Sequence, residues 1–170
     1  MTACITSAIE ICAERNGDEF IPGDRILALK GATLGIPVGR QTVVPDQLFA
    51  LRSKAGFRSY VLEVDRGTEP VQSSAARKSL KASVEQYGQI LRDQTHKPHY
   101  GLKSNLLVLW VFTTATRRDR FLELVATHTP DQSAGFLTLV VEGGFPRLEA
   151  CLDVVSGAWR RVHGGKVGLF

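Results

Sequence analysis

Apolar residues recur at helical spacing in three segments of the chain. In residues 3–15 the i, i+3, i+4, i+7 pattern is formed by Ile5, Ala8, Ile9 and Cys12, and Asn16-Gly17 ends the segment. A longer helix is predicted from Ser73 or Ser74 to about Asp93, because its apolar stripe comprises Ala76, Leu80, Val84, Tyr87 and Leu91. A third helix is predicted from Thr116 to about His128.

The remaining apolar runs are short and predict strands. The clearest pair flanks the turn-like residues 53–56 and therefore predicts a hairpin. The run LLVLWVF is continuous, which is typical of a central strand covered on both faces. Residues 31–39 are punctuated by Gly and Pro and are interpreted as a connection. The predicted strands cover 25–30, 43–51, 58–65, 106–112, 136–141 and 158–162.

These elements follow the order α-β-β-β-α-β-α-β-β. A hairpin followed by a crossover helix and a buried strand predicts an α/β fold with a mixed central sheet flanked by helices. The chain contains no repeat, low-complexity tract or clear linker. Residues 1–170 are therefore expected to form a single domain.

Three acidic residues stand on the predicted hairpin. A turn centred between Lys54 and Ala55 places Asp46 directly opposite Glu63, and Asp65 points to the same face as Glu63. Neighbouring like charges repel unless a cation lies between them or one is protonated. Hard cations such as Mg²⁺ or Mn²⁺ take carboxylate oxygens, so the pattern predicts a metal site formed by these three side chains.

A second interpretation of the same residues assigns them no metal. A register slip of one residue turns Asp46 to the other face of the sheet. Asp46 would then begin a turn after Pro45, and Asp65 would form an ordinary surface pair with Arg66. The spacing by itself leaves both interpretations open.

Composition and cysteine content exclude several classes of protein. The 170 residues are 44% hydrophobic and 22% charged, as in ordinary globular proteins. No apolar run approaches the ~18 residues of a membrane span, and no signal peptide opens the chain. Three scattered cysteines provide neither a disulfide framework nor a tetrathiolate zinc site. We expect a cytoplasmic protein without a membrane partner.

The net charge of +4 is concentrated in the middle of the chain. Residues 71–120 contain 9 Lys/Arg and 3 Asp/Glu, whereas the segments on either side carry a slight acidic excess. Such a distribution favours a polyanionic partner such as DNA, although a solvated helix face would show it too. The candidate DNA-binding residues are Arg66, Arg77, Lys78, Lys81, Arg117, Arg118 and Arg120.

The hairpin residues also resemble a known pattern. Pro45-Asp46, followed by Glu63-Val64-Asp65 at a strand end, resembles the PD-(D/E)XK nucleases, whose core has the order αβββαβ. The run from Leu62 to Pro70, LEVDRGTEP, more specifically resembles the replication-relaxation family of plasmids and integrative elements. The resemblance implies a restriction-endonuclease-like core over about 3–142, with a C-terminal strand extension over 143–170.

The sequence departs from the nuclease pattern at one position. The motif has a Lys two residues after its second acidic residue, where this chain has Asp65. The resemblance implies that Lys78 or Lys81 on the next helix, or Lys30, supplies that charge to the attacking water. It also implies a glutamate from the first helix, for which Glu10 is a better candidate than Glu14.

The leading hypothesis is a Mg²⁺- or Mn²⁺-dependent DNA endonuclease of a mobile element. Its catalytic residues would be Asp46, Glu63, Asp65, Lys78, Lys81 and Glu10. One alternative is a non-catalytic DNA-binding accessory factor in a replication or relaxation complex, and another is a protein-interaction domain. The resemblance also implies that family members often carry an N-terminal winged-helix domain, which is not recognised in this sequence. Two interpretations are open: a short relative of the family, or a protein with a separate DNA-targeting or relaxase-type partner. The sequence leaves open whether the protein forms a homodimer.

Overall fold

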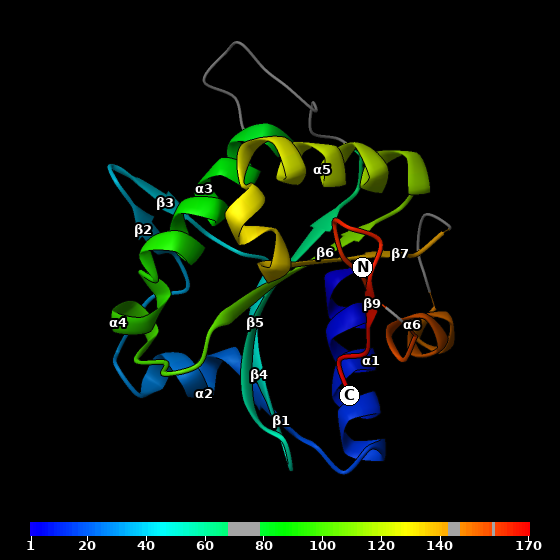
Figure 1. Ribbon diagram of the computed structural model, residues 1–170. Helices are drawn as coiled ribbons and strands as arrows, with labels where there is room; N and C mark the ends of the chain where they lie inside the picture. The colour runs from blue at the N-terminus through cyan, green and yellow to red at the C-terminus, as the bar shows by residue number, and fades with distance from the viewer. Residues whose placement is uncertain (68–78, 143–146, 158) are drawn as a thin grey trace.

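A computed structural model describes residues 1–67, 79–142, 147–157 and 159–170. Its centre is a seven-stranded sheet in the order β1-β4-β5-β6-β7-β8-β9 (Figure 1). The strands are β1 (Glu19–Pro22), β4 (Gln47–Ser53), β5 (Gly56–Asp65), β6 (Leu106–Phe112), β7 (Phe136–Val140), β8 (Trp159–Arg160) and β9 (Lys166–Val167). The predicted mixed α/β sheet is confirmed, because β1, β4 and β5 are antiparallel neighbours whereas β6 and β7 continue parallel to β5.

The predicted hairpin has the predicted register. Gln47 pairs with Leu62 and Ser53 with Gly56, so the turn is centred between Lys54 and Ala55. The buried run of β6 lies between β5 and β7, and six of its seven residues are buried. Full burial of both faces explains why its sequence is continuously apolar instead of alternating.

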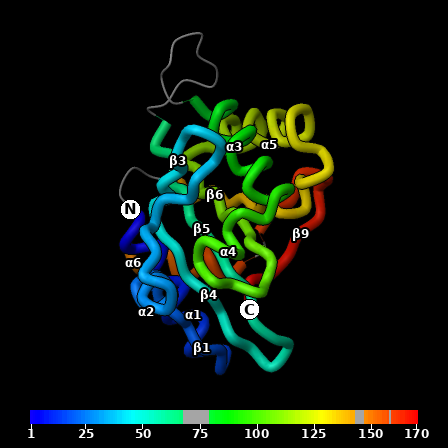
Figure 2. Tube along the Cα trace, turned by 90° about the vertical axis from the view of Figure 1, so that its left-hand side faces the viewer, coloured from blue at the N-terminus to red at the C-terminus, as the bar shows by residue number. Residues whose placement is uncertain are grey.

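Helices cover both faces of the sheet. Helices α1 (Thr2–Arg15) and α6 (Leu148–Val155) pack together on one face, and α3 (Leu80–Asp93) and α5 (Ala115–His128) pack on the other (Figures 1 and 2). Each face has its own hydrophobic core. Successive strand residues alternate between these cores: Val61 belongs to the α3/α5 side and Leu62 to the α1/α6 side.

The segment between α1 and the hairpin differs from the prediction. Residues 25–30 are not a strand: α2 (Gly23–Ala28) begins after Pro22, with Asp24 in its first turn, and buries Ile26. The first strand is instead β1, too short to show a period. At Gly23 a Cβ would lie 2.4 Å from the carbonyl oxygen of Leu48, so only glycine fits where α2 leaves the sheet. A small hairpin, β2 (Ile36–Val38) with β3 (Gln41–Val43), begins inside the predicted connection and ends at Val43, where the first strand of the predicted hairpin was expected to start.

The C-terminal part also differs. Residues 143–170 were expected to be a strand extension, but they contain helix α6, and the two strands there are only two residues long. The hydrophobic periodicity does not predict helix α6, because Cys151 and Val155 are the only two buried residues of this helix. Two short helices, α4 (His96–Tyr100) and η1 (Pro130–Gly135), complete the described chain. No helix of the described residues has the length and apolar character needed to cross a membrane.

Candidate functional site

Asp46 lies one position before β4, at the open end of the hairpin. Continuing the β4–β5 register places it beside Glu63, and the backbone N–H of Val64 donates a hydrogen bond to Asp46 Oδ2 over 2.8 Å. Leu48 and Ala50 belong to the core beneath α3 and α5, so strand alternation directs Asp46 to that same face. Asp46 is exposed and accessible from solvent.

Glu63 is buried on the same face, with 6% of its surface exposed. The hydroxyl of Tyr87, from α3, donates a hydrogen bond to Glu63 Oε1 over 2.5 Å. Burial of Tyr87, followed by the nearby charges of Glu63 and Asp46, raises the pKa of Tyr87 well above its ordinary value. Tyr87 is therefore a neutral donor at physiological pH.

Asp65 has a different environment. Arg117 Nε, from α5, donates to Asp65 Oδ2 over 2.5 Å, and the backbone N–H of Gly67 donates to Oδ1 over 2.7 Å. The Asp65 and Arg117 side chains are 4% and 15% exposed, so this is a buried ion pair and not the surface pair with Arg66 expected under the second interpretation. The described residues contain no group of three His, Cys, Asp or Glu side chains placed to hold a metal ion. The structure thus brings Asp46 and Glu63 together, and Asp65 turns to α5.

Two further polar atoms are buried in this layer. Trp110 stands beside Glu63 in the β5–β6 register, and Ser83 precedes Tyr87 by one turn of α3. Trp110 Nε1 and Ser83 Oγ have no hydrogen-bond partner among the described residues. A buried donor without a partner costs about 1–3 kcal/mol, and such groups in native proteins call for a water or ligand as explanation.

The remaining candidates from the sequence are Lys81, Glu10, Lys30, Lys78 and Arg77. Lys81 forms an i, i+4 ion pair with Glu85, 3.8 Å between Nζ and Oε1. Glu10 is exposed on α1, which covers the opposite face of the sheet from Glu63, so the structure does not join it to the carboxylate pair. The side chain of Lys30 lies against Gly101 beside α4. Lys78 and Arg77 lie outside the described residues.

Most of the described candidate DNA-binding residues follow β5 or lie in the first two turns of α5, which begins after β6. Arg66 follows β5 and is exposed, and Arg120 is exposed on α5. Arg118 pairs with Asp119 at 2.7 Å, and Arg160 approaches the same carboxylate at 3.7 Å. Thr114 is the N-cap residue of α5, and its hydroxyl oxygen accepts a hydrogen bond from the backbone N–H of Arg117. Cations in the first turn oppose the helix dipole, which is consistent with an anionic partner for them.

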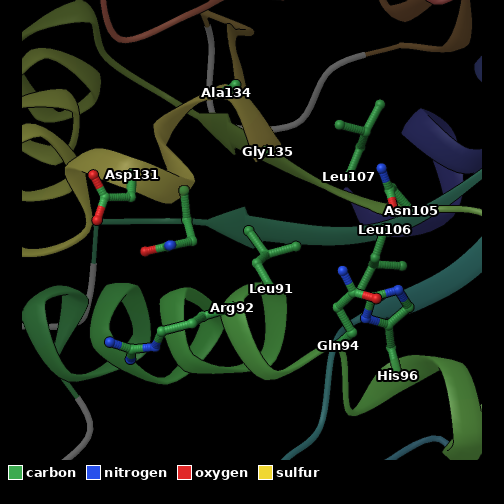
Figure 3. A pocket seen from close by; sticks show the side chains of 11 residues that line it. Leu91, Arg92, Gln94, His96, Asn105, Leu106, Leu107, Asp131, Ala134 and Gly135 are labelled. Carbon is green, nitrogen blue, oxygen red and sulfur yellow. The ribbon is translucent and has the colours of Figure 1, made fainter.

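A pocket of about 410 Å³ lies at the other end of α3 (Figure 3). Its lining comes from the C-terminal turn of α3, the beginning of β6 and η1, and includes Arg92, Gln94, His96, Asn105 and Asp131. Burial lowers the pKa of His96, which favours its neutral form. This pocket lies at the start of β6, whereas Glu63 and Asp65 lie at the end of the parallel strand β5, so the two sites are separate.

Sequence reasoning missed Tyr87 and Arg117 as site partners. The periodicity identifies Tyr87 only as a member of an apolar helix stripe. A buried tyrosine hydroxyl usually has a hydrogen-bond partner, so a tyrosine on a stripe that faces an acidic strand is a signal of a contact with that strand. Arg117 was grouped with surface arginines, and nothing in the spacing marks its partner 52 residues away.

Comparison with known families gives one match. The family model described as replication-relaxation matches residues 12–106, more than half of the chain. The matched range begins in α1 and ends at the start of β6, so it includes Asp46, Glu63, Asp65 and Tyr87. A search of curated proteins and a search of solved structures each give no match.

Proposed function

The chain belongs to the replication-relaxation family, and we propose that it acts on DNA as a divalent-cation-dependent endonuclease. The family associates the protein with the replication or relaxation of plasmids and other mobile elements. The hydrolysis of a phosphodiester is our addition to that broader role. The observation that carries it is the pairing of Asp46 and Glu63 on one face of a hairpin.

The order of elements supports the proposal. Leaving aside the insertion of α2, β2 and β3 and the short helix α4, the described chain passes through α1, β1, β4, β5, α3 and β6. This is one helix, three antiparallel strands, a second helix and a strand parallel to the third, which is the αβββαβ order implied by the nuclease resemblance. The carboxylate pair stands on the second and third of these strands, as the motif requires.

The donor set fits a magnesium or manganese ion held by two carboxylates. Mg²⁺ commonly binds one or two carboxylates and keeps several waters, so Asp46 and Glu63 suffice without Asp65. When bound, such an ion supplies an activated water and stabilises charge on the phosphate. Exposed Asp46 faces solvent, while buried Glu63 is held in place by Tyr87. Lys81, in the first turn of α3, and Lys78 are the proposed cations for the attacking water.

The basic residues support a DNA-binding role. Arg66, Arg118 and Arg120 lie near the strand ends that carry the carboxylates and are proposed to contact the phosphate backbone, together with Arg77 and Lys78. Arg117 holds Asp65 and thereby fixes the first turn of α5 beside this edge. A DNA-targeting or relaxase-type protein is the proposed partner that supplies sequence choice.

The proposal is tested by incubating supercoiled plasmid with protein and Mg²⁺ or Mn²⁺. We expect nicking by the wild-type protein and a loss of at least about 100-fold in Asp46→Ala and Glu63→Ala, because each removes a proposed metal ligand. Glu149→Ala, an exposed carboxylate on α6 at the other face, is the matched control and is expected to nick normally. Nicking that survives both substitutions would sink the proposed site.

Asp65 favours a second candidate function. It occupies the position of the nuclease lysine and is committed to a buried ion pair, which is compatible with a DNA-binding accessory factor that does not cut. In the same experiment this factor would shift the mobility of the plasmid and leave it intact. Absence of DNA binding even at low salt would favour the protein-interaction domain instead.

A further inference from the structure

We infer that Tyr87 is a positioning residue that fixes the orientation of the Glu63 carboxylate for metal binding. The inference rests on the proposed function and extends it from α3 into the site. Its basis is the buried hydrogen bond from the Tyr87 hydroxyl to Glu63 Oε1, 2.5 Å long. Both residues are buried, so water does not compete readily for this contact.

The tyrosine ring is itself held in place. Trp110 from β6 meets it edge to face, with ring centroids 5.8 Å apart and planes at 84°. The adjacent Gly88 is packed so closely on Thr129 that an added Cβ would lie 2.1 Å from Thr129 Cγ2. Ser79 caps α3 by accepting a hydrogen bond from Ala82 N. Helix and ring therefore form a rigid support for the hydroxyl.

A rigid donor matters because the three side-chain torsions of a glutamate allow its carboxylate oxygens to point in several directions. Side chains that hydrogen-bond metal ligands limit this freedom, and removing such a partner typically costs 10–100-fold in metal affinity or activity. Tyr87 meets the description: it is buried, neutral and aimed at one oxygen of a proposed ligand. It does not touch the substrate and so is not itself a catalytic residue.

The protein contains a matched control for this tyrosine. Tyr100 is equally buried in the same hydrophobic core and also donates a 2.5 Å hydrogen bond, but its acceptor is the backbone carbonyl of Leu34. Tyr87→Phe and Tyr100→Phe therefore remove the same hydroxyl from similar surroundings. Only the first removes a partner of Glu63.

The test compares wild type and these two variants. Mn²⁺ binding is measured by titration calorimetry, plasmid nicking under single-turnover conditions, and folding by circular dichroism and urea unfolding. We expect both variants to lose similar stability, while Tyr87→Phe alone loses about 10–100-fold in Mn²⁺ affinity or in nicking rate. DNA binding without a divalent cation should match wild type in both. Equal Mn²⁺ affinity and nicking in the two variants would overturn the inference.

A second comparison tests whether Tyr87 acts through Glu63. In a Glu63→Gln background, the substitution Tyr87→Phe should cause no further loss of Mn²⁺ affinity, because the residue acts through Glu63. An additional loss of the same size would show an independent role and overturn the inference. Wild-type protein that neither binds Mn²⁺ nor nicks DNA would refute the proposed function itself, which separates the two failures.

Discussion

Glu63 and Asp65 are two residues apart on one strand, share one face and are both buried, yet their partners differ in kind. Glu63 accepts a hydrogen bond from the neutral Tyr87 of α3, whereas Asp65 forms an ion pair with Arg117 of α5. The first contact orients a carboxylate, and the second compensates its charge and fastens a helix to the sheet. An E-x-D pattern can therefore combine one proposed metal ligand, Glu63, with one structural anchor, the ion pair of Asp65 with Arg117.

The largest expected effect tests the anchor. Asp65→Asn keeps the shape of the side chain and removes its charge, which leaves Arg117 buried beside a neutral amide. Breaking a buried pair from one side costs about 3–5 kcal/mol, so we expect a loss near 3 kcal/mol in the free energy of unfolding, measured in urea. A loss below about 1 kcal/mol, the size expected for exposed pairs, would contradict the anchor role.

The second effect concerns pH and compares Tyr87 with Tyr100. Burial raises the pKa of both hydroxyls, and in Tyr87 the neighbouring carboxylates raise it further. Below pH 10 folded and unfolded tyrosines are both neutral, so their stabilising contribution is complete there. Above it only the unfolded chain ionises, and each such tyrosine lowers stability by up to about 1.4 kcal/mol per pH unit.

We therefore expect urea unfolding to show falling stability above about pH 10. Tyr87→Phe and Tyr100→Phe should each make that decline shallower than in wild type. Since the hydroxyl group is lost in both, an unchanged slope in either variant would mean that its tyrosine ionises in the folded protein as it does when unfolded.

The third prediction changes the packing of α3, the helix that carries Tyr87, and leaves Glu63 and Tyr87 themselves unchanged. Gly88→Ala forces a methyl group against Thr129 Cγ2. The overpacking costs about 1–3 kcal/mol. The better helix propensity of alanine returns only roughly 1 kcal/mol, so we expect a net loss of stability. Adding Thr129→Ser removes that methyl and keeps the hydroxyl that bonds to Val125 O. The double variant should recover part of the lost stability and Mn²⁺ binding, because the Thr129 Cβ remains 2.9 Å from the position of the added methyl group. Failure to recover would mean that α3 is held by other contacts.

The smallest effect on stability is expected at the surface next to the anchor. Arg118 pairs with the exposed Asp119, but its own side chain is only 16% exposed, so Arg118→Ala should lower the free energy of unfolding by about 1 kcal/mol, through lost packing as well as lost pairing. If Arg118 contacts a phosphate, the slope of DNA affinity against salt concentration should fall by about one. An unchanged slope in filter-binding measurements would remove Arg118 from the proposed DNA-binding residues.

Local sequence determined much of the sheet. The β4–β5 register follows from a four-residue turn and period-two packing, both of which are readable over about twenty residues. The adjacency of Asp46 and Glu63 follows from that register. Helix α2 and strand β1 were not predicted correctly, because each buries too few residues for its period to show.

The α/β fold and the basic middle segment can be predicted from the sequence, because hydrophobic periods and charge runs are local. The sequence also predicted the pairing of Asp46 with Glu63, but as one of two interpretations, and the folded hairpin selects it. The contact of Tyr87 with Glu63 and the pairing of Arg117 with Asp65, 52 residues away, appear only in the folded structure. Both contacts require α3 and α5 to pack on the same face of the sheet. That packing buries apolar surface over the whole domain. Hydrophobic burial is non-directional, so it does not specify which polar groups at the ends of side chains come into contact.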